Sequence, residues 1–79
     1  MEAVPLSTLH PGQSCIIASI LHTAGMRRRL LDLGFAPDAC ISVLYTGPSG
    51  SPVALFCKET VIALRRQDCE KIYVVQDRE

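Results

Sequence analysis

The side chains with the clearest capacity for chemistry are cysteines and histidines. Thiolate and imidazole groups are the ligands that transition metals such as zinc prefer, and paired thiols can also form disulfides. No two cysteines form a CxxC or CxxxC motif, and His10 and His22 are not at ligand spacing with each other. A cysteine-rich metal site and two disulfides therefore stay open only as alternatives for the four cysteines, which are Cys15, Cys40, Cys57 and Cys69.

Reduced thiols packed in a core are the interpretation that the sequence favours. Three cysteines lie in the apolar segments CII, ACI and LFC, where a free cysteine packs as a small hydrophobic residue. Four cysteines in 79 residues also fall below the roughly 8–10% that is typical of disulfide scaffolds. We interpret His22 as a surface histidine at a strand end, near a buried Cys15. No metal-ligand set is assigned, and binding of Fe2+, Mn2+ or Zn2+ stays open.

No pattern of residues indicates catalysis. The sequence shows no nucleophile with a base and an orienting group, and no paired acid/base carboxylates. The Gly47–Gly50 segment is a turn rather than a phosphate-binding loop, since no Gly-Lys-Ser/Thr follows it. We therefore expect that this protein is not an enzyme.

A run of three arginines lies in the segment 24–33, which the apolar spacing predicts to be a helix. Thr23 is a suitable N-cap, and Gly34 follows the last apolar position, as glycine commonly does at helix ends. At about 100° per residue, three apolar residues share one face of the helix and should pack on the core. They are Met26, Leu30 and Leu33.

The opposite side of this helix is the candidate binding site. Arg27 and Arg28 point away from the apolar face, and Leu31 falls between them. One interpretation is a solvated basic face with an incidental leucine. The other is an apolar contact ringed by guanidinium groups, which suits docking on an acidic protein surface. Arg29, at the flank, is expected to donate hydrogen bonds to backbone carbonyls.

Two further arginines, Arg65 and Arg66, follow the Ile-Ala-Leu segment at the end of the expected strand 60–65. They have two interpretations. They either pair with Asp68 or Glu70, as surface ion pairs worth roughly 0–1 kcal/mol each, or they enlarge the basic docking surface. The sequence does not show how far they lie from the helix.

Composition limits the class of protein to which these residues belong. Hydrophobic residues make up 48% and charged residues 20% of the chain, which is typical of a globular protein. Eight basic residues balance eight acidic ones, so binding of nucleic acid through overall positive charge is excluded. Apolar runs are far shorter than the roughly 20 residues that span a bilayer, and no secretory signal is evident. We expect one cytoplasmic domain covering 1–79, with no membrane insertion.

The elements that must position these residues are short and mostly extended. Besides the helix, we expect a helical turn at 67–70 before the last strand and hairpin-length turns at 46–52 and 58–59. The predicted fold is mostly β, a small barrel of about five strands with the helix after the first strand. A two-layer α+β fold is the alternative. The expected strands are 15–21, 39–45, 53–57, 60–65 and 71–75.

The order of these motifs resembles the ferrous-iron transport protein A (FeoA) family. The likeness runs through LSTLHPGQSCIIASI, RRRLLDLGFAPDACISVL and GSPVALFCKETVIALRRQDCEKIYV, about residues 6–75. Its most specific part is RLxxLGFxP, starting at Arg29 and followed by IALR and IYV. The chain departs from the family at Asp38, where glycine is usual, and at Ser51, where the family has Gly-Asp-Pro. Asp38 tolerates the left-handed backbone better than most residues.

The resemblance implies an SH3-like barrel and a small cytosolic accessory protein of a bacterial ferrous-iron uptake system. The implied partner is the cytosolic part of a FeoB-type membrane permease. The alternative is a metal-responsive regulatory module, because the same barrel occurs as the C-terminal domain of iron- and manganese-dependent repressors. A homo-oligomer also stays open. We expect no direct binding of nucleic acid, since no helix-turn-helix segment is evident.

Overall fold

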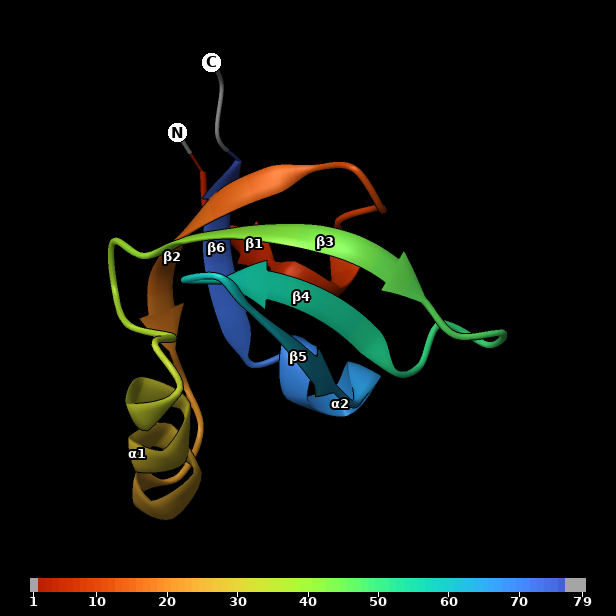
Figure 1. Ribbon diagram of the computed structural model, residues 1–79. Coiled ribbons are helices and arrows are strands. Elements are labelled where there is room, and N and C mark those ends of the chain that lie inside the picture. Colours follow the sequence, from red (N-terminus) through yellow and green to blue (C-terminus); the bar gives the residue numbers. More distant parts are fainter. Residues whose placement is uncertain (1, 77–79) are drawn as a thin grey trace.

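The computed structural model describes residues 2–76 (Figure 1). Strands predominate, and all the strand pairs are antiparallel. In chain order the elements are β1 (Val4–Pro5), the 3-10 helix η1 (Leu6–Thr8), β2 (Ser14–Ile20), α1 (Ala24–Asp32), β3 (Cys40–Thr46), β4 (Val53–Cys57), β5 (Thr60–Leu64), α2 (Arg66–Cys69) and β6 (Ile72–Gln76).

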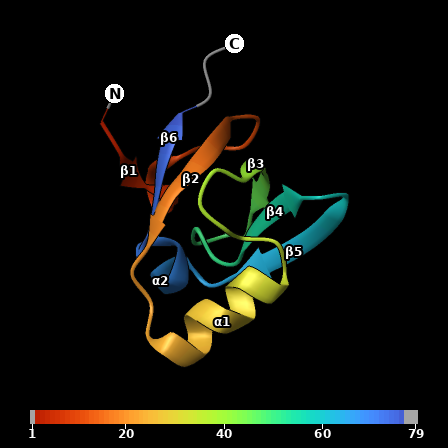
Figure 2. The same ribbon diagram turned by 90° about the vertical axis from the view of Figure 1, so that its left-hand side faces the viewer.

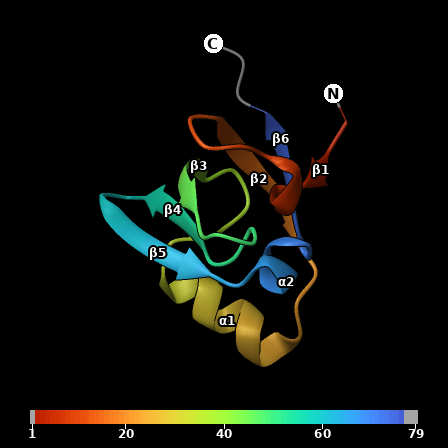
Figure 3. The same ribbon diagram turned by 90° about the vertical axis from the view of Figure 1, so that its right-hand side faces the viewer.

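The strands form a six-stranded sheet in the order β1-β6-β2-β3-β4-β5. The register shifts between Ile17 and Ser19 in β2, and between Val43 and Tyr45 in β3. Such irregularities bend a strand and increase its twist, and the sheet is strongly curled (Figures 2 and 3). The predicted small barrel is confirmed. It has one more strand than predicted, because β1 is only two residues long and carries no strand pattern.

The inner face of the curled sheet is apolar. Residues alternate between this face and solvent, as in β3, where Ile41 and Val43 are buried and Leu44 is exposed. The largest fully buried side chain is that of Phe35, which lies outside the strands. The core residues with the lowest exposure are Leu6, Cys15, Ile17, Leu30, Phe35, Ile41, Leu55, Cys57, Cys69, Ile72 and Val74.

Helix α1 ends in a Schellman motif, a backbone arrangement that uses a glycine to stop a helix. Gly34 has φ 100°, its N–H donates to the carbonyl of Leu31 at 3.0 Å, and the N–H of Phe35 donates to the carbonyl of Leu30 at 2.8 Å. The predicted stop at Gly34 is thus confirmed. Thr23 is the N-cap residue, but its side chain makes no capping hydrogen bond.

One residue that was predicted to pack on the core does not. Leu33 is 42% exposed, whereas Leu30 is fully buried and Met26 is half-buried. The Schellman turn explains this, because it brings Phe35 back toward the core beside Leu30. Leu33 is the C-cap residue and still has helical φ and ψ, so at about 100° per residue its side chain points about 60° away from that of Leu30, and Phe35 is buried there instead.

One prediction about the cysteines also needs correction. Cys40, which lies in the apolar segment ACI, is exposed. The reason is alternation, since its neighbour Ile41 takes the inward position of β3. Cys69 lies between Asp68 and Glu70 in the sequence and is nevertheless fully buried, as the interpretation of core thiols implies. Cys15 and Cys57 are buried, as predicted.

No helix within residues 2–76 has the length and apolar character needed to cross a membrane.

Candidate functional site

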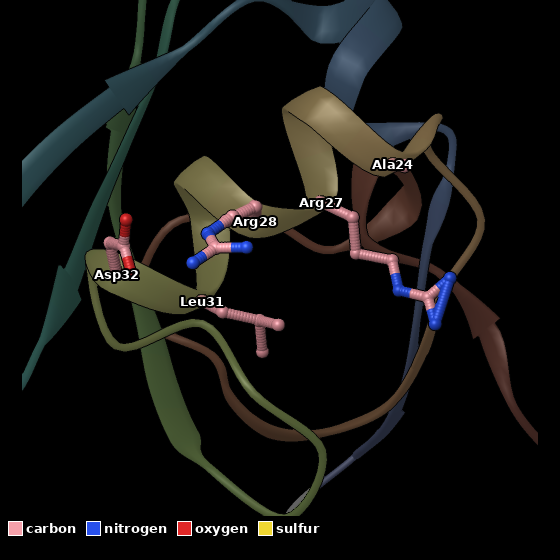
Figure 4. A pocket seen from close by; sticks show the side chains of 5 residues that line it. All are labelled: Ala24, Arg27, Arg28, Leu31 and Asp32. Carbon is pink, nitrogen blue, oxygen red and sulfur yellow. The ribbon is translucent and has the colours of Figure 1, made fainter.

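Helix α1 projects from one end of the sheet and carries an open depression on its outer face (Figures 1 and 4). The depression has a volume of about 510 Å3. Its lining residues recur every three or four positions, so they form one helical face. They are Ala24, Arg27, Arg28, Leu31 and Asp32.

Leu31 lies between the side chains of Arg27 and Arg28 (Figure 4). It is 44% exposed, although the next residue in the chain toward the N-terminus, Leu30, is fully buried. The two neighbours differ because their side chains point about 100° apart around α1, and only the side of Leu30 faces the core. The structure therefore brings together three of the residues proposed from the sequence. We call this set, Arg27, Arg28 and Leu31, the α1 surface.

The positive charge of the α1 surface is not neutralised within the described part of the chain. Neither Arg27 nor Arg28 forms an ion pair there, although Asp32 lines the same depression. Exposed guanidinium groups around an apolar side chain can meet carboxylates at their rim and an apolar group at their centre. This arrangement can bind a protein surface.

Arg29 does not have the role expected for it. Its side chain is exposed and makes no hydrogen bond to residues 2–76, so it does not support backbone carbonyls of the barrel. The backbone hydrogen bonds of the Schellman motif satisfy the carbonyls of Leu30 and Leu31 without an arginine. Arg29 lies instead in the last turn of α1, where a positive charge interacts favourably with the helix dipole.

Arg66 lies in a different depression from the α1 surface. That depression is lined by residues of the N-terminal segment, β3, β4 and their connection, and it shares no lining residue with the first. Helices α1 and α2 also stand apart in Figure 1. Arg65 is exposed and precedes α2 as its N-cap. Within residues 2–76, neither arginine pairs with Asp68 or Glu70.

Asp68 is paired with His22 instead, a contact that sequence reasoning missed. The Nε2 atom of His22 lies 3.7 Å from an Oδ1 atom of Asp68. His22 is buried rather than at the surface, because the connection from β2 to α1 packs against α2. Neither ring nitrogen has a hydrogen-bond partner among the described residues. No local pattern could have revealed this contact, since 46 positions separate the two residues.

The cysteines do not form a metal centre in the described part of the chain. No three His, Cys, Asp or Glu side chains come together there to hold an ion. Burial raises the pKa of the Cys57 thiol, which donates to the carbonyl of Gly34 at 3.5 Å. Burial, and secondarily the charges of Asp68 and Glu70, raise the pKa of Cys69 to about 12. Because metals bind the thiolate, the protonated thiols of Cys57 and Cys69 are poor ligands.

Comparison with known proteins gives a family match and a curated relative. The FeoA domain model matches residues 4–76. The relative is the "Fe(2+) transport protein A/Fe(2+) transporter FeoB fusion protein" of Porphyromonas gingivalis, which is 33% identical over 69 residues. The match covers 87% of this chain but only 8% of the fusion protein.

Solved structures show the same fold. A FeoA protein from Chlorobium tepidum is 33% identical with a TM-score of 0.88, over 92% of this chain and 70% of that one. FeoA of Stenotrophomonas maltophilia, a prokaryotic SH3 domain protein solved with zinc, is 28% identical with a TM-score of 0.79, over 99% of this chain and 98% of that one. The expected SH3-like fold is confirmed.

A manganese-dependent transcriptional repressor also contains this fold. Its TM-score is 0.84 at 20% identity, over 96% of this chain and 42% of the repressor. At this identity the likeness concerns the fold alone.

Proposed function

Since the chain belongs to the FeoA domain family, we propose that it is an accessory protein of ferrous-iron uptake that docks on the cytosolic part of a FeoB-type permease. The docking site is the α1 surface. The observation that carries this proposal is an exposed leucine between two arginines that have no ion-pair partner in residues 2–76. Such a surface suits a partner with carboxylates around an apolar group.

The fusion relative supports a FeoB-type partner. In that protein a segment similar to this chain is covalently joined to a transporter, so the two parts share one chain. Covalent linkage gives a high effective concentration, at which a weak contact is sufficient for association. Association between separate chains lacks this advantage and needs a contact surface, and the α1 surface is the one that we propose.

Substitution of Leu31 tests the docking site. Leu31→Glu puts a carboxylate between the two arginines and removes the apolar centre, and we expect at least about tenfold weaker binding to the purified cytosolic domain of the permease. The measurement is a binding isotherm by biolayer interferometry, with circular dichroism to show that the fold is intact.

Leu44→Glu is the matched control. Leu44 lies on β3, and its exposure of 41% is close to the 44% of Leu31, so both variants add the same charge at a similarly exposed leucine. We expect the control to bind as the wild type does. If Leu31→Glu also binds normally, or if both variants lose binding equally, the α1 surface is not the docking site.

The second candidate function, a metal-responsive regulatory module, has less support. The repressor shares only the fold, and residues 2–76 hold no cluster of metal ligands. Anaerobic titration with Fe(II), Mn(II) and Zn(II) separates the two functions. Tight stoichiometric binding would favour the regulator, whereas no binding would leave the docking role ahead.

A further inference from the structure

Figure 3 shows that η1, the connection between β3 and β4, and α2 come together. Residues of these segments line a second depression. Its volume is about 310 Å3, near the lower limit of small-molecule sites. The buried side chains of Leu6 and Val53 form part of its apolar lining. The other lining residues are Ser7, Leu9, His10, Pro11, Thr46, Gly50 and Arg66. We call this depression the Arg66 pocket.

Among residues 2–76, Arg66 is the only lining residue with a permanent charge, and no carboxylate lines the pocket. Its guanidinium group forms no ion pair with residues 2–76. The backbone around it is held in place, because the Arg66 N–H donates to the hydroxyl oxygen of Ser51 at 3.1 Å. Gly50, which has φ 85°, allows the chain to turn beside it. The pocket thus carries one positive charge, on an exposed side chain with a held backbone, and it has no negative partner among the described residues.

Three neutral polar side chains in the pocket also have unused hydrogen-bonding groups. The hydroxyls of Ser7 and Thr46 and the ring of His10 make no hydrogen bond within the described residues. The loop that carries His10 is nevertheless fixed, since the His10 backbone N–H donates to Oε1 of Gln13 at 2.7 Å. These three side chains therefore line the same depression as Arg66, beside its apolar residues.

We propose that the Arg66 pocket binds a monocarboxylate with a small branched apolar body. A guanidinium group matches a carboxylate in a two-bond fork, and the hydroxyls supply additional donors. Arg66 supplies one positive charge, which matches the single negative charge of a carboxylate. A phosphate dianion carries two negative charges, so one of them would have no positive partner in the pocket. The apolar lining accommodates the body of the ligand. This inference is independent of the docking role of α1.

The test compares an acid with its uncharged analogue. We would titrate the isotopically labelled full chain with N-acetyl-leucine and with N-acetyl-leucinamide, and follow the backbone amide signals by NMR. The acid should give saturable shifts around Ser7, Thr46 and Arg66, with at least about tenfold weaker binding of the amide. Equal binding of acid and amide, or no saturable shift up to the solubility limit of the acid, would overturn the proposal.

Two arginine variants locate the charge. Arg66→Gln should weaken binding of N-acetyl-leucine about tenfold or more, whereas Arg65→Gln should leave it unchanged, because Arg65 does not line the pocket. Spectra of both variants away from the pocket show whether the fold is intact. Equal binding by wild type and Arg66→Gln would contradict the assignment.

Two more probes define the ligand. If 4-methylpentanoate, which lacks the amide, binds as well as N-acetyl-leucine, the pocket takes a free acid. Weaker binding of 4-methylpentanoate indicates the C-terminal residue of a peptide. Inorganic phosphate that binds as tightly as N-acetyl-leucine would contradict the choice of a carboxylate.

Discussion

Leu30 and Leu31 are adjacent in the chain, but Leu30 is fully buried and Leu31 is 44% exposed. Helical spacing was sufficient to predict this difference, because adjacent residues in a helix point about 100° apart. The same spacing also placed Leu33 on the apolar face, but Leu33 is 42% exposed and Phe35, two residues later, is fully buried. A helical pattern therefore predicts side-chain direction within α1, but it does not show which residues the rest of the chain covers at the C-terminal end of the helix.

Truncation of the two leucines should have unequal effects on stability. Leu30→Ala removes a fully buried side chain and should lower the free energy of unfolding by about 2–5 kcal/mol. Leu31→Ala should change it by about 0.5 kcal/mol or less, since the side chain is largely in solvent. Urea denaturation followed by circular dichroism measures both. Similar losses in the two variants would mean that Leu31 also packs on the core.

The cysteines show what residue types alone do not reveal. An apolar neighbourhood predicted the burial of Cys15 and Cys57, but it could not show which face of β3 carries Cys40. The burial of Cys69 and of His22 depends on how α2 packs on the rest of the chain. That packing brings together segments that are far apart in the sequence, so a local pattern of residues could not predict it.

The raised pKa of Cys69 predicts how stability depends on pH. Burial, with Asp68 and Glu70, raises this pKa from 9.0 to about 12, so the unfolded chain loses the thiol proton at a lower pH than the folded chain. The folded state then binds more protons, and the free energy of unfolding falls as pH rises from 9 to 12, by about 1.4 kcal/mol per pH unit from this thiol.

Cys69→Ala should remove that contribution, so its unfolding free energy should fall less steeply than that of the wild type above pH 9. Cys40→Ala, which alters an exposed thiol, is the matched control and should keep the wild-type slope. Urea denaturation at several alkaline pH values provides the measurement. Identical slopes for Cys69→Ala and the wild type would disprove the predicted linkage.

At the scale of elements, the helix and the later strands were predictable because local signals agreed. The strand 53–57 was predicted with its observed bounds, and the helix 24–33 exceeds α1 by one residue. Gly34 and Pro37 marked the end of the helix. Strand β1 was not predicted, because two residues are too few to show a periodic pattern. Its pairing with β6 defines it.

The backbone is strained in the connection between β4 and β5, and substitution of its two residues should relieve this strain. Lys58 and Glu59 form a two-residue hairpin turn with φ 50° and 64°, values that favour asparagine and glycine. The double substitution Lys58→Asn/Glu59→Gly should raise the free energy of unfolding by about 1 kcal/mol, because it relieves left-handed strain. The midpoint of urea denaturation reports the change.

A second double variant controls for charge. Lys58→Ala/Glu59→Ala removes the same two charges but keeps a Cβ at both left-handed positions, so no gain in stability is expected. Equal stabilisation by the two double variants would show that charge, and not backbone conformation, limits the turn.

At the scale of the whole molecule, the arginines divide between two surfaces. Arg27 and Arg28 flank Leu31 on α1, whereas Arg66 lines a pocket formed by η1, β3 and β4. The sequence could place each arginine on its element, but it could not show how the elements are arranged. The α1 surface depends on one helix and was predictable. The Arg66 pocket depends on segments that only the folded chain brings together.

The most direct test of the docking role is hydrogen–deuterium exchange of this chain with and without the purified cytosolic domain of the FeoB-type permease. Docking through the α1 surface predicts slower exchange in residues 24–32, with the Arg66 pocket and the β1–β6 edge of the sheet unchanged. Protection of the pocket or that edge with no change in α1 would contradict the account.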